Sequence, residues 1–538
     1  MDPKPLPAHP SLEQYKKQAK ELLKAYRSAD VETIRRVKRN HPRFEKLSEP
    51  GFEISKFTLA DAQLVIAREH GFESWPRFAR RIEVMNSEVA ALENPLAAFI
   101  EAAIWHGTLE AADAILAEHP EIARSSIHVA AILGDDAAVG RFIAADPRNA
   151  TKKEAPYEGD ALVYLCLSKY LRLDKKRSDA FVRAATALLD AGADPNTGFM
   201  AKDEYGDFET ALYGAAGVAQ HAELTRLLLE RGADPNEEET PYHSPESYDN
   251  AALKVLVESG KLNADSLTTM LLRKADMHDY DGMKYLLEHG ADPNRMTRWK
   301  FTALHQALRR DNGIELIDLM LDHGADPTVK NEADGKSGVV MAVRRGRGDM
   351  LRSFARRGFS LEMEGVDPLI SAACATNAVA AGRYLAGLSP HLLPELLAEG
   401  GKLLAEFAGN GVTEGVRMFL ELGVPVDARY DGDPYFDIAK DSTALHVAAW
   451  KAWPKTVKLL IESGAPIDAQ DAKGRTPLML AVKACVDSYW TNRRSPESVE
   501  ALLKAGASNS GVDYPCGYAE VDELLQAYAS KSAANERE

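Results

Sequence analysis

The sequence predicts an all-α fold, a solenoid in which short helix pairs stack one upon the next. Ala and Leu are abundant, β-branched runs are scarce and only 7% of the residues are aromatic, which together favour helices over strands. The string Gly-Ala-Asp-Pro recurs after Leu-rich helical stretches, at Gly192–Pro195, Gly232–Pro235, Gly290–Pro293 and Gly324–Pro327. Recurrence at a period of roughly 33 residues indicates stacked units that each contact only their neighbours.

The first 90 residues differ from the repeats and are expected to form an N-terminal helical module. Residues 11–27 and 31–40 have the apolar spacing of amphipathic helices, and a turn is expected around Pro50-Gly51. A further stretch, residues 59–78, follows that turn. We expect the module to cap the array, because an uncapped first repeat would expose its apolar face.

Each repeat divides into two helices with their own end signals. In the copy around Gly324, residues 314–323 have helical apolar spacing, and Gly324 supplies the left-handed residue that ends the helix. Pro327 then prevents the helix from resuming. The first helix of the same repeat begins at Thr302, a good N-cap, and the Ala and Leu residues that follow permit close packing.

These two halves resemble a known family. The segment 471–481, Asp-Ala-Lys-Gly-Arg-Thr-Pro-Leu-Met-Leu-Ala, and each Leu-Leu-x-x-Gly-Ala-Asp-Pro-Asn resemble the ankyrin repeat consensus. The resemblance implies a finger-like turn followed by two antiparallel helices, and a role in binding other proteins. The strings at 11–23 and 59–78 resemble a helical module found ahead of bacterial ankyrin arrays.

The spacing of the terminal glycines sets the expected domain boundaries. We expect an N-terminal cap at residues 1–90, an ankyrin-type array of about twelve repeats at 95–510, a capping helix at 511–530 and a flexible tail at 531–538. The unit beginning at Thr240 is about one turn short. Two degenerate units fill the interval between Gly358 and Gly423.

Charge and cysteine usage limit the possible partners. The net charge of −16 argues against a surface that grips nucleic acid or an anionic membrane over its whole extent. The four cysteines show no Cys-x-x-Cys spacing, so they are expected to be thiols in a reducing compartment. With no signal peptide and no long apolar run in the sequence, a cytoplasmic protein is expected.

No catalytic motif is present, so we expect neither enzymatic activity nor a cofactor or metal. Gly335-Lys-Ser-Gly resembles a phosphate-binding loop, but Lys330 stands where the earlier glycine is required. His128, His305 and His446 occupy the same position in three repeats. Their imidazoles are expected to form hydrogen bonds with neighbouring loops. An enzyme with a site hidden in the degenerate repeats is the alternative.

One constellation predicts a binding site. Aligned repeats place basic pairs at the end of the inner helix, and the finger at 298–301 adds aromatic residues; a later repeat places Trp450 at the equivalent position. The candidate partner-binding residues are Arg273, Lys274, Arg298, Trp299, Phe301, Arg309, Arg310, Arg344, Arg345 and Trp450. Residues 295–357 contain 13 basic and 8 acidic residues, which gives this segment a positive balance inside an acidic chain.

Two interpretations of these residues stay open. As a concave groove, they would bind a protein segment that is acidic and carries an apolar anchor, since Trp and Arg are enriched in binding hot spots. Alternatively, the same cations complement helix dipoles or pair with nearby acids. A further functional alternative is nucleic-acid or polyphosphate binding on the row of basic pairs.

Overall fold

The computed structural model describes residues 4–7, 10–28, 30–41, 57–82, 85, 94–202, 206–375 and 377–535. The expected turn around Pro50-Gly51 lies outside these residues. Two compact units are present, and each is described by itself. One comprises mainly Ala79–Gly335, and the other mainly Glu13–Phe78 with Lys336–Glu538.

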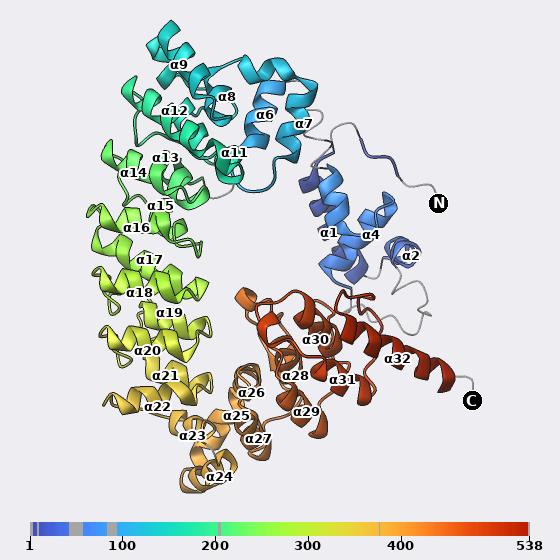
Figure 1. Cartoon of the computed structure of the whole chain (residues 1–538). Coiled ribbons are helices and arrows are strands. Elements are labelled where there is room, and N and C mark those ends of the chain that lie inside the picture. Colours follow the sequence, from blue (N-terminus) through green and yellow to red (C-terminus); the bar gives the residue numbers. More distant parts are fainter. Residues whose placement is uncertain are drawn as a thin grey trace. The chain divides into compact units, whose positions relative to one another are not determined.

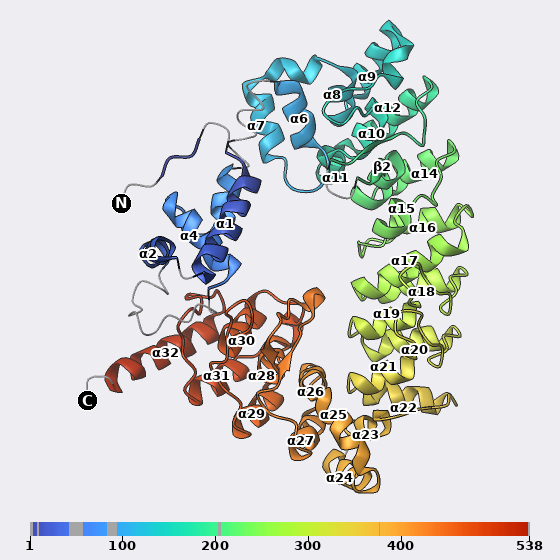
Figure 2. The ribbon, with the colours of Figure 1, turned by 180° about the vertical axis from the view of Figure 1, so that it is seen from behind.

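The unit at 79–335 is a stack of helix pairs, which Figures 1 and 2 show from opposite sides. Its seven pairs are α6 (Pro95–Ala103) and α7 (Glu110–Glu118), α8 (Ile127–Ile132) and α9 (Asp136–Ala145), α10 (Ala161–Cys166) and α12 (Ser178–Asp190), α13 (Ala211–Tyr213, continued by a π-turn) and α14 (Ala222–Glu230), α15 (Glu239–His243) and α16 (Ala251–Glu258), α17 (Ala264–Met277) and α18 (Tyr280–Glu288), and α19 (Ala303–Arg309) and α20 (Ile314–Asp322). The short helix α11 (Lys169–Leu173) lies within the third pair. First helices contact first helices of adjacent pairs, as α15 contacts α17 and α17 contacts α19.

The other unit contains the N-terminal helices and five further pairs. The N-terminal helices are α1 (Leu12–Arg27), α2 (Val31–Asn40), α4 (Leu59–Glu69) and a helix at 75–82. The pairs are α21 (Gly338–Arg344) and α22 (Gly348–Arg356), α23 (Asp367–Ala372) and α24 (Ala378–Leu388), α26 (Gly400–Gly409) and α27 (Thr413–Glu421), α28 (Ala444–Trp450) and α29 (Pro454–Glu462), and α30 (Pro477–Val486) and α31 (Glu497–Lys504). The helix α25 (Leu393–Ala398) precedes α26, and α32 (Ala519–Asn535) follows the last pair.

The described residues thus contain seven pairs in one unit and five in the other, in agreement with the expected all-α solenoid of about twelve repeats. Strands are confined, in this part of the chain, to two antiparallel ribbons: β1 (Gly198–Met200) with β2 (Phe208–Thr210), and β3 (Arg429–Tyr430) with β4 (Ser442–Thr443). The last helix extends to Asn535; the flexible tail expected at 531–538 stays a prediction. The role of residues 1–90 as a cap stays a prediction.

The glycine of the repeated motif is needed for its backbone conformation. Gly192, Gly232, Gly290 and Gly324 have φ between 88° and 103°, the left-handed region that ends a helix. No atom lies within 4 Å of a Cβ built at any of these four positions. The requirement is therefore conformational rather than steric.

The asparagine that follows the motif joins one repeat to the next, a role that the sequence did not predict. The amide of Asn294 donates to the carbonyl of Gly324 at 2.8 Å, and its Oδ1 accepts from the N–H of Asp326 at 2.8 Å. Asn196 makes the same two bonds to Gly232 and Asp234. We call this two-bond bridge the asparagine clasp. Asn236 makes an equivalent pair to the next turn.

The predicted structural role of the histidines is confirmed. His305 bonds the hydroxyl of Thr302, the N-cap of its own helix, at 2.7 Å, and its Nε2 lies 3.0 Å from the carbonyl oxygen of Val329 in the next finger. His446 makes the corresponding contact with the carbonyl of Arg475 at 3.1 Å. Burial lowers the pKa of His446 to about 4, so this imidazole is neutral at physiological pH.

The remaining sequence expectations concern thiols, metals and membranes. All four cysteines are free thiols, two of them buried and two half-buried. Among the described residues, no group of His, Cys, Asp and Glu is arranged to hold a metal ion. Over the same residues, no helix combines the length and apolarity needed to cross a bilayer.

We predict that Asn294→Ala weakens the attachment of the turn after α20, residues 324–326, to the preceding finger. Loss of two hydrogen bonds to backbone groups costs about 1–2 kcal/mol, so the amide of Asp326 should exchange with solvent at least about fivefold faster. Hydrogen exchange read at that amide is the measurement. Thr328→Ala is the matched control, because Thr328 holds the asparagine position in the next copy and its side chain is exposed and bonds only locally to Asp326. Equal effects of the two substitutions would contradict a clasp.

Candidate partner-binding surface

The finger before α19 is a tight turn that carries Trp299. The N–H of Thr297 donates to the carbonyl of Phe301 at 3.0 Å, and the N–H of Lys300 donates to the carbonyl of Thr297 at 2.8 Å. Lys300 has φ of 66°, which lets the chain reverse within these five residues. Trp299 and Phe301 are both half-buried, so each ring keeps an exposed portion.

Trp299 lies between Tyr242 and Arg298. Its ring centroid is 5.5 Å from that of Tyr242, and the guanidinium of Arg298 lies 4.6 Å above its ring. The guanidinium of Arg273 lies 4.1 Å from the ring of Tyr242. Cations over aromatic faces are attracted by the ring quadrupole. Arg298 thus contacts Trp299 directly, and Arg273 is linked to Trp299 through Tyr242; a role of these residues in binding stays a prediction.

Phe301 and Arg309 form a second such contact in the same repeat. The guanidinium of Arg309 lies 4.3 Å from the centroid of Phe301 and donates to Oε1 of Gln306 at 3.1 Å. Arg309 is half-buried, at the end of α19. We call Tyr242, Arg273, Arg298 and Trp299 the Trp299 group. Together with Phe301 and Arg309, this group forms the candidate surface.

The rings continue beyond Tyr242 into earlier repeats. Tyr242 contacts His243, His243 contacts Tyr213, and Tyr213 contacts Trp105, with centroid separations of 4.8, 5.2 and 6.3 Å. We call Trp105, Tyr213, His243, Tyr242 and Trp299 the aromatic row. Its first four members were not predicted from the sequence, because they lie in repeats with weak motifs. The sequence features that could have indicated the row were Trp105, which follows Ile104, and the adjacent pair Tyr242-His243.

Acidic residues hold His243 in the charged form. Burial lowers its pKa, but hydrogen bonds from its two ring nitrogens to Glu239 and Glu246, each at 3.1 Å, outweigh burial and raise the pKa to about 9. Glu246 also pairs with Arg273. The row therefore contains a cation at neutral pH, hydrogen-bonded to two carboxylates.

Lys274 does not belong to the surface, contrary to the sequence prediction. Its side chain is fully buried, and Nζ donates to Asp279 and to the carbonyl of Ser247, both at 2.6 Å. The neighbouring Arg310 is 17% exposed and donates to Asp276 at 2.7 Å. Lys274 joins its repeat to Ser247 of the preceding one, and Arg310 joins α19 to Asp276 on α17.

The pair Arg344-Arg345 is likewise engaged inside the protein. Arg344 donates to Asp367 at 2.8 Å and to Glu399 at 2.6 Å, and Arg345 donates to Glu406 at 3.3 Å. The two side chains are 23% and 13% exposed. The expected row of accessible basic pairs is therefore absent from the described structure at these positions. These carboxylates lie up to 61 residues away in the sequence.

Trp450 is buried beneath the finger before α28 and is not an exposed groove residue. It is 2% exposed, and its indole N–H donates to the carbonyl of Phe436 at 2.6 Å. Phe436 belongs to a long finger whose packing on α28 the sequence did not predict.

Stacked helix pairs with finger turns define this chain as a helical-repeat solenoid, a class that offers extended surfaces for binding. Three family models identify the repeat. The description "Ankyrin repeats (3 copies)" matches residues 394–513, "Ankyrin repeats (many copies)" matches 271–314, and "Ankyrin repeat" matches 299–332. Residues 271–332 and 394–513 of this chain therefore contain ankyrin repeats. The human ASB11 ankyrin repeat domain is similar at 26% identity, covering 40% of this chain and 90% of that chain with a TM-score of 0.31.

We predict that the His243 ring titrates near pH 9. Because its pKa is raised above the ordinary value of 6.5, its contribution to stability is complete below about pH 6.5 and is lost as pH rises through about 9. NMR titration of the His243 ring protons measures the midpoint. Substituting both acids (Glu239→Gln with Glu246→Gln) should move the midpoint below 6.5, whereas Glu258→Gln, on α16, should not. A wild-type midpoint near 6.5 would show that the carboxylates do not engage the ring.

Proposed function

We propose that the candidate surface binds a segment of another protein. Ankyrin repeats generally mediate protein–protein interaction, and the family is generally non-catalytic. The observation that carries the proposal is the half-buried Trp299, held between Tyr242 and Arg298 on a rigid finger. A large ring fixed in place loses little conformational freedom on binding, which is why Trp dominates interface hot spots.

The chemistry of the surface favours a partner segment with a carboxylate beside an apolar side chain. Arg298 is 51% exposed and forms an ion pair with Glu238, which is itself 75% exposed. Such an exposed pair is worth about 0–1 kcal/mol, so a partner's carboxylate can replace Glu238 at little cost. Trp299 and Phe301 then supply contact for an apolar anchor.

The same contacts speak against polyanion binding. Arg310, Arg344 and Arg345 point to carboxylates of their own chain and are mostly buried. A nucleic acid or polyphosphate would need those cations exposed, since its affinity comes from charge neutralisation. We therefore place the binding function on the Trp299 group rather than on the row of basic pairs. We also propose a cytoplasmic, bacterial setting, in keeping with the free thiols.

We predict that Trp299→Ala abolishes most of the binding to selected peptides. Peptide display against the full chain should enrich sequences that combine Asp or Glu with an apolar residue, and Trp299→Ala should weaken their binding by about 2 kcal/mol or more, roughly 30-fold. Arg298→Ala should weaken it less and mainly slow association. Fluorescence anisotropy with labelled peptides gives both values.

Tyr384→Ala provides the matched control for this experiment. Tyr384 is an aromatic residue that is 68% exposed on α24, outside the candidate surface. Its removal should leave peptide binding unchanged. If the selected peptides bind wild type and Trp299→Ala with the same affinity, the candidate surface is not the binding site.

A further inference from the structure

The finger between β3 and β4 carries an insertion that folds back on the repeats. The strands pair at residues 429–430 and 442–443, and Asp433 and Ile438 bond each other's backbone at 2.9 and 3.0 Å. We call residues 433–438, Asp-Pro-Tyr-Phe-Asp-Ile, the finger insertion. The next finger is much shorter, because it turns within Asp471–Arg475.

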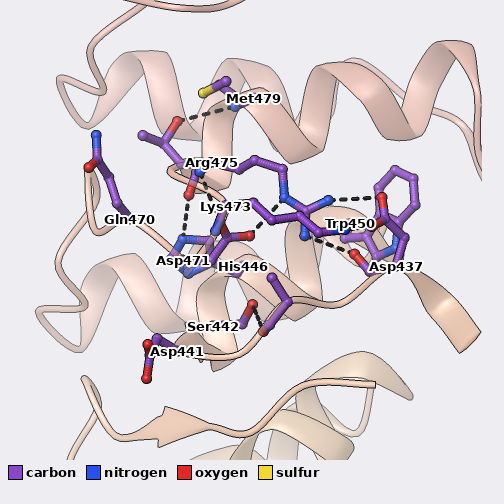
Figure 3. A network of polar contacts seen from close by, with 12 residues as sticks. Asp437, Asp441, Ser442, His446, Trp450, Gln470, Asp471, Lys473, Arg475 and Met479 are labelled. Carbon is purple, nitrogen blue, oxygen red and sulfur yellow. Dashed lines mark hydrogen bonds and ion pairs between the residues drawn. The ribbon is translucent and has the colours of Figure 1, made fainter. Parts of the chain in front are cut away.

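Three cations from the following repeat converge on one carboxylate of the finger insertion. Asp437 accepts hydrogen bonds from Lys473, from Arg475 at 2.9 Å and from Lys483 at 3.1 Å. Figure 3 shows Arg475 extending from Asp471 to Asp437. Burial raises the pKa of Asp437, but the hydrogen bonds and charges of these cations outweigh it and lower the pKa to about 2.

Phe436, the residue before Asp437, packs among aromatic side chains of the neighbouring elements. Phe436 is 2% exposed, its ring centroid lies 5.4 Å from that of Trp490, and its carbonyl accepts the indole N–H of Trp450. The ammonium of Lys451 lies 4.4 Å from the Phe436 ring. Trp490 belongs to a second insertion, between α30 and α31, whose Tyr489 stacks on Tyr435 with centroids 6.0 Å apart.

The finger insertion thus contacts the repeats as a bound peptide would. The cations and the aromatic walls come from α28, α30, the next finger and the second insertion, whereas the carboxylate and the buried ring come from adjacent residues of one loop. Lys473 and Lys483 are 57% and 44% exposed, so their pairs with Asp437 are open to water and to exchange.

We propose that Trp450, Lys473, Arg475, Lys483 and Trp490 form a second binding surface, for protein segments that carry an aromatic residue followed directly by Asp. The finger insertion occupies this surface in cis. A partner segment of the same chemistry displaces it, placing its ring against Trp450 and Trp490 and its carboxylate among the three cations. This surface is separate from the Trp299 group and does not depend on its function.

A blocked peptide with the sequence of residues 433–438 tests the proposal. In the full chain with residues 433–438 replaced by six Gly and Ser residues, the labelled peptide should bind, and wild type should bind it at least about tenfold more weakly. The reason is that a tethered loop competes at an effective concentration on the order of millimolar. A peptide with the Asp437→Asn change should bind at least about tenfold more weakly, because it loses the charged acceptor.

Two lysine variants distinguish peptide binding at this surface from a nonspecific effect of positive charge. Lys483→Ala in the replaced chain should weaken peptide binding at least about fivefold, whereas Lys504→Ala, which removes an exposed lysine paired with Glu500, should not. Absence of peptide binding to a replaced chain whose circular dichroism and melting match wild type would overturn the proposal.

If the chain with the replaced insertion does not fold, hydrogen exchange of the wild-type chain tests the proposal. The N–H of Ile438 donates to Asp433 within the finger insertion, so displacement frees that amide. Saturating peptide, at about 10 mM, should speed its exchange at least about threefold and leave the amide of Asp326 unchanged. Unaltered exchange at Ile438 under these conditions would overturn the proposal.

Discussion

The asparagine clasp is the contact on which the geometry of the 79–335 unit depends. A solenoid has no single core, so each repeat is positioned only by its neighbours. Apolar packing between helices fixes their separation but resists sliding weakly, since dispersion and burial have no direction. Two hydrogen bonds from one planar amide, as at Asn294, and one from His305 to the next finger supply the missing direction. They set each finger at a fixed offset from the last.

Aromatic side chains from distant repeats meet along the same stack. Trp105 and Trp299 are almost 200 positions apart in the sequence, yet both belong to one continuous row of ring contacts. A row built on fingers that moved independently would expose a changing surface and would bind with a large entropic cost. The charged His243, bonded to α15 itself and to Glu246 beyond it, further restricts the middle of the row.

The sequence predicted the fold well because the signals that end and begin helices are local. A glycine such as Gly324 and an N-cap such as Thr302 act within four residues of their own positions. The candidate site was predicted only in part, because burial depends on distant partners. Nothing near Arg345 indicates Glu406, and nothing near Trp450 indicates that an insertion covers it. Trp299 was correctly placed at the finger, since its own turn determines its exposure.

The clasp has a consequence for how such an array changes over evolutionary time. Both hydrogen bonds that Asn294 makes to the next repeat involve backbone groups, the Gly324 carbonyl and the Asp326 amide. Every repeat that ends in the same turn offers those same two groups. Gene duplication or loss of a whole repeat therefore leaves each junction with an acceptable neighbour, and drift in side-chain identity is tolerated. Array length can vary by recombination while the joint itself stays constant.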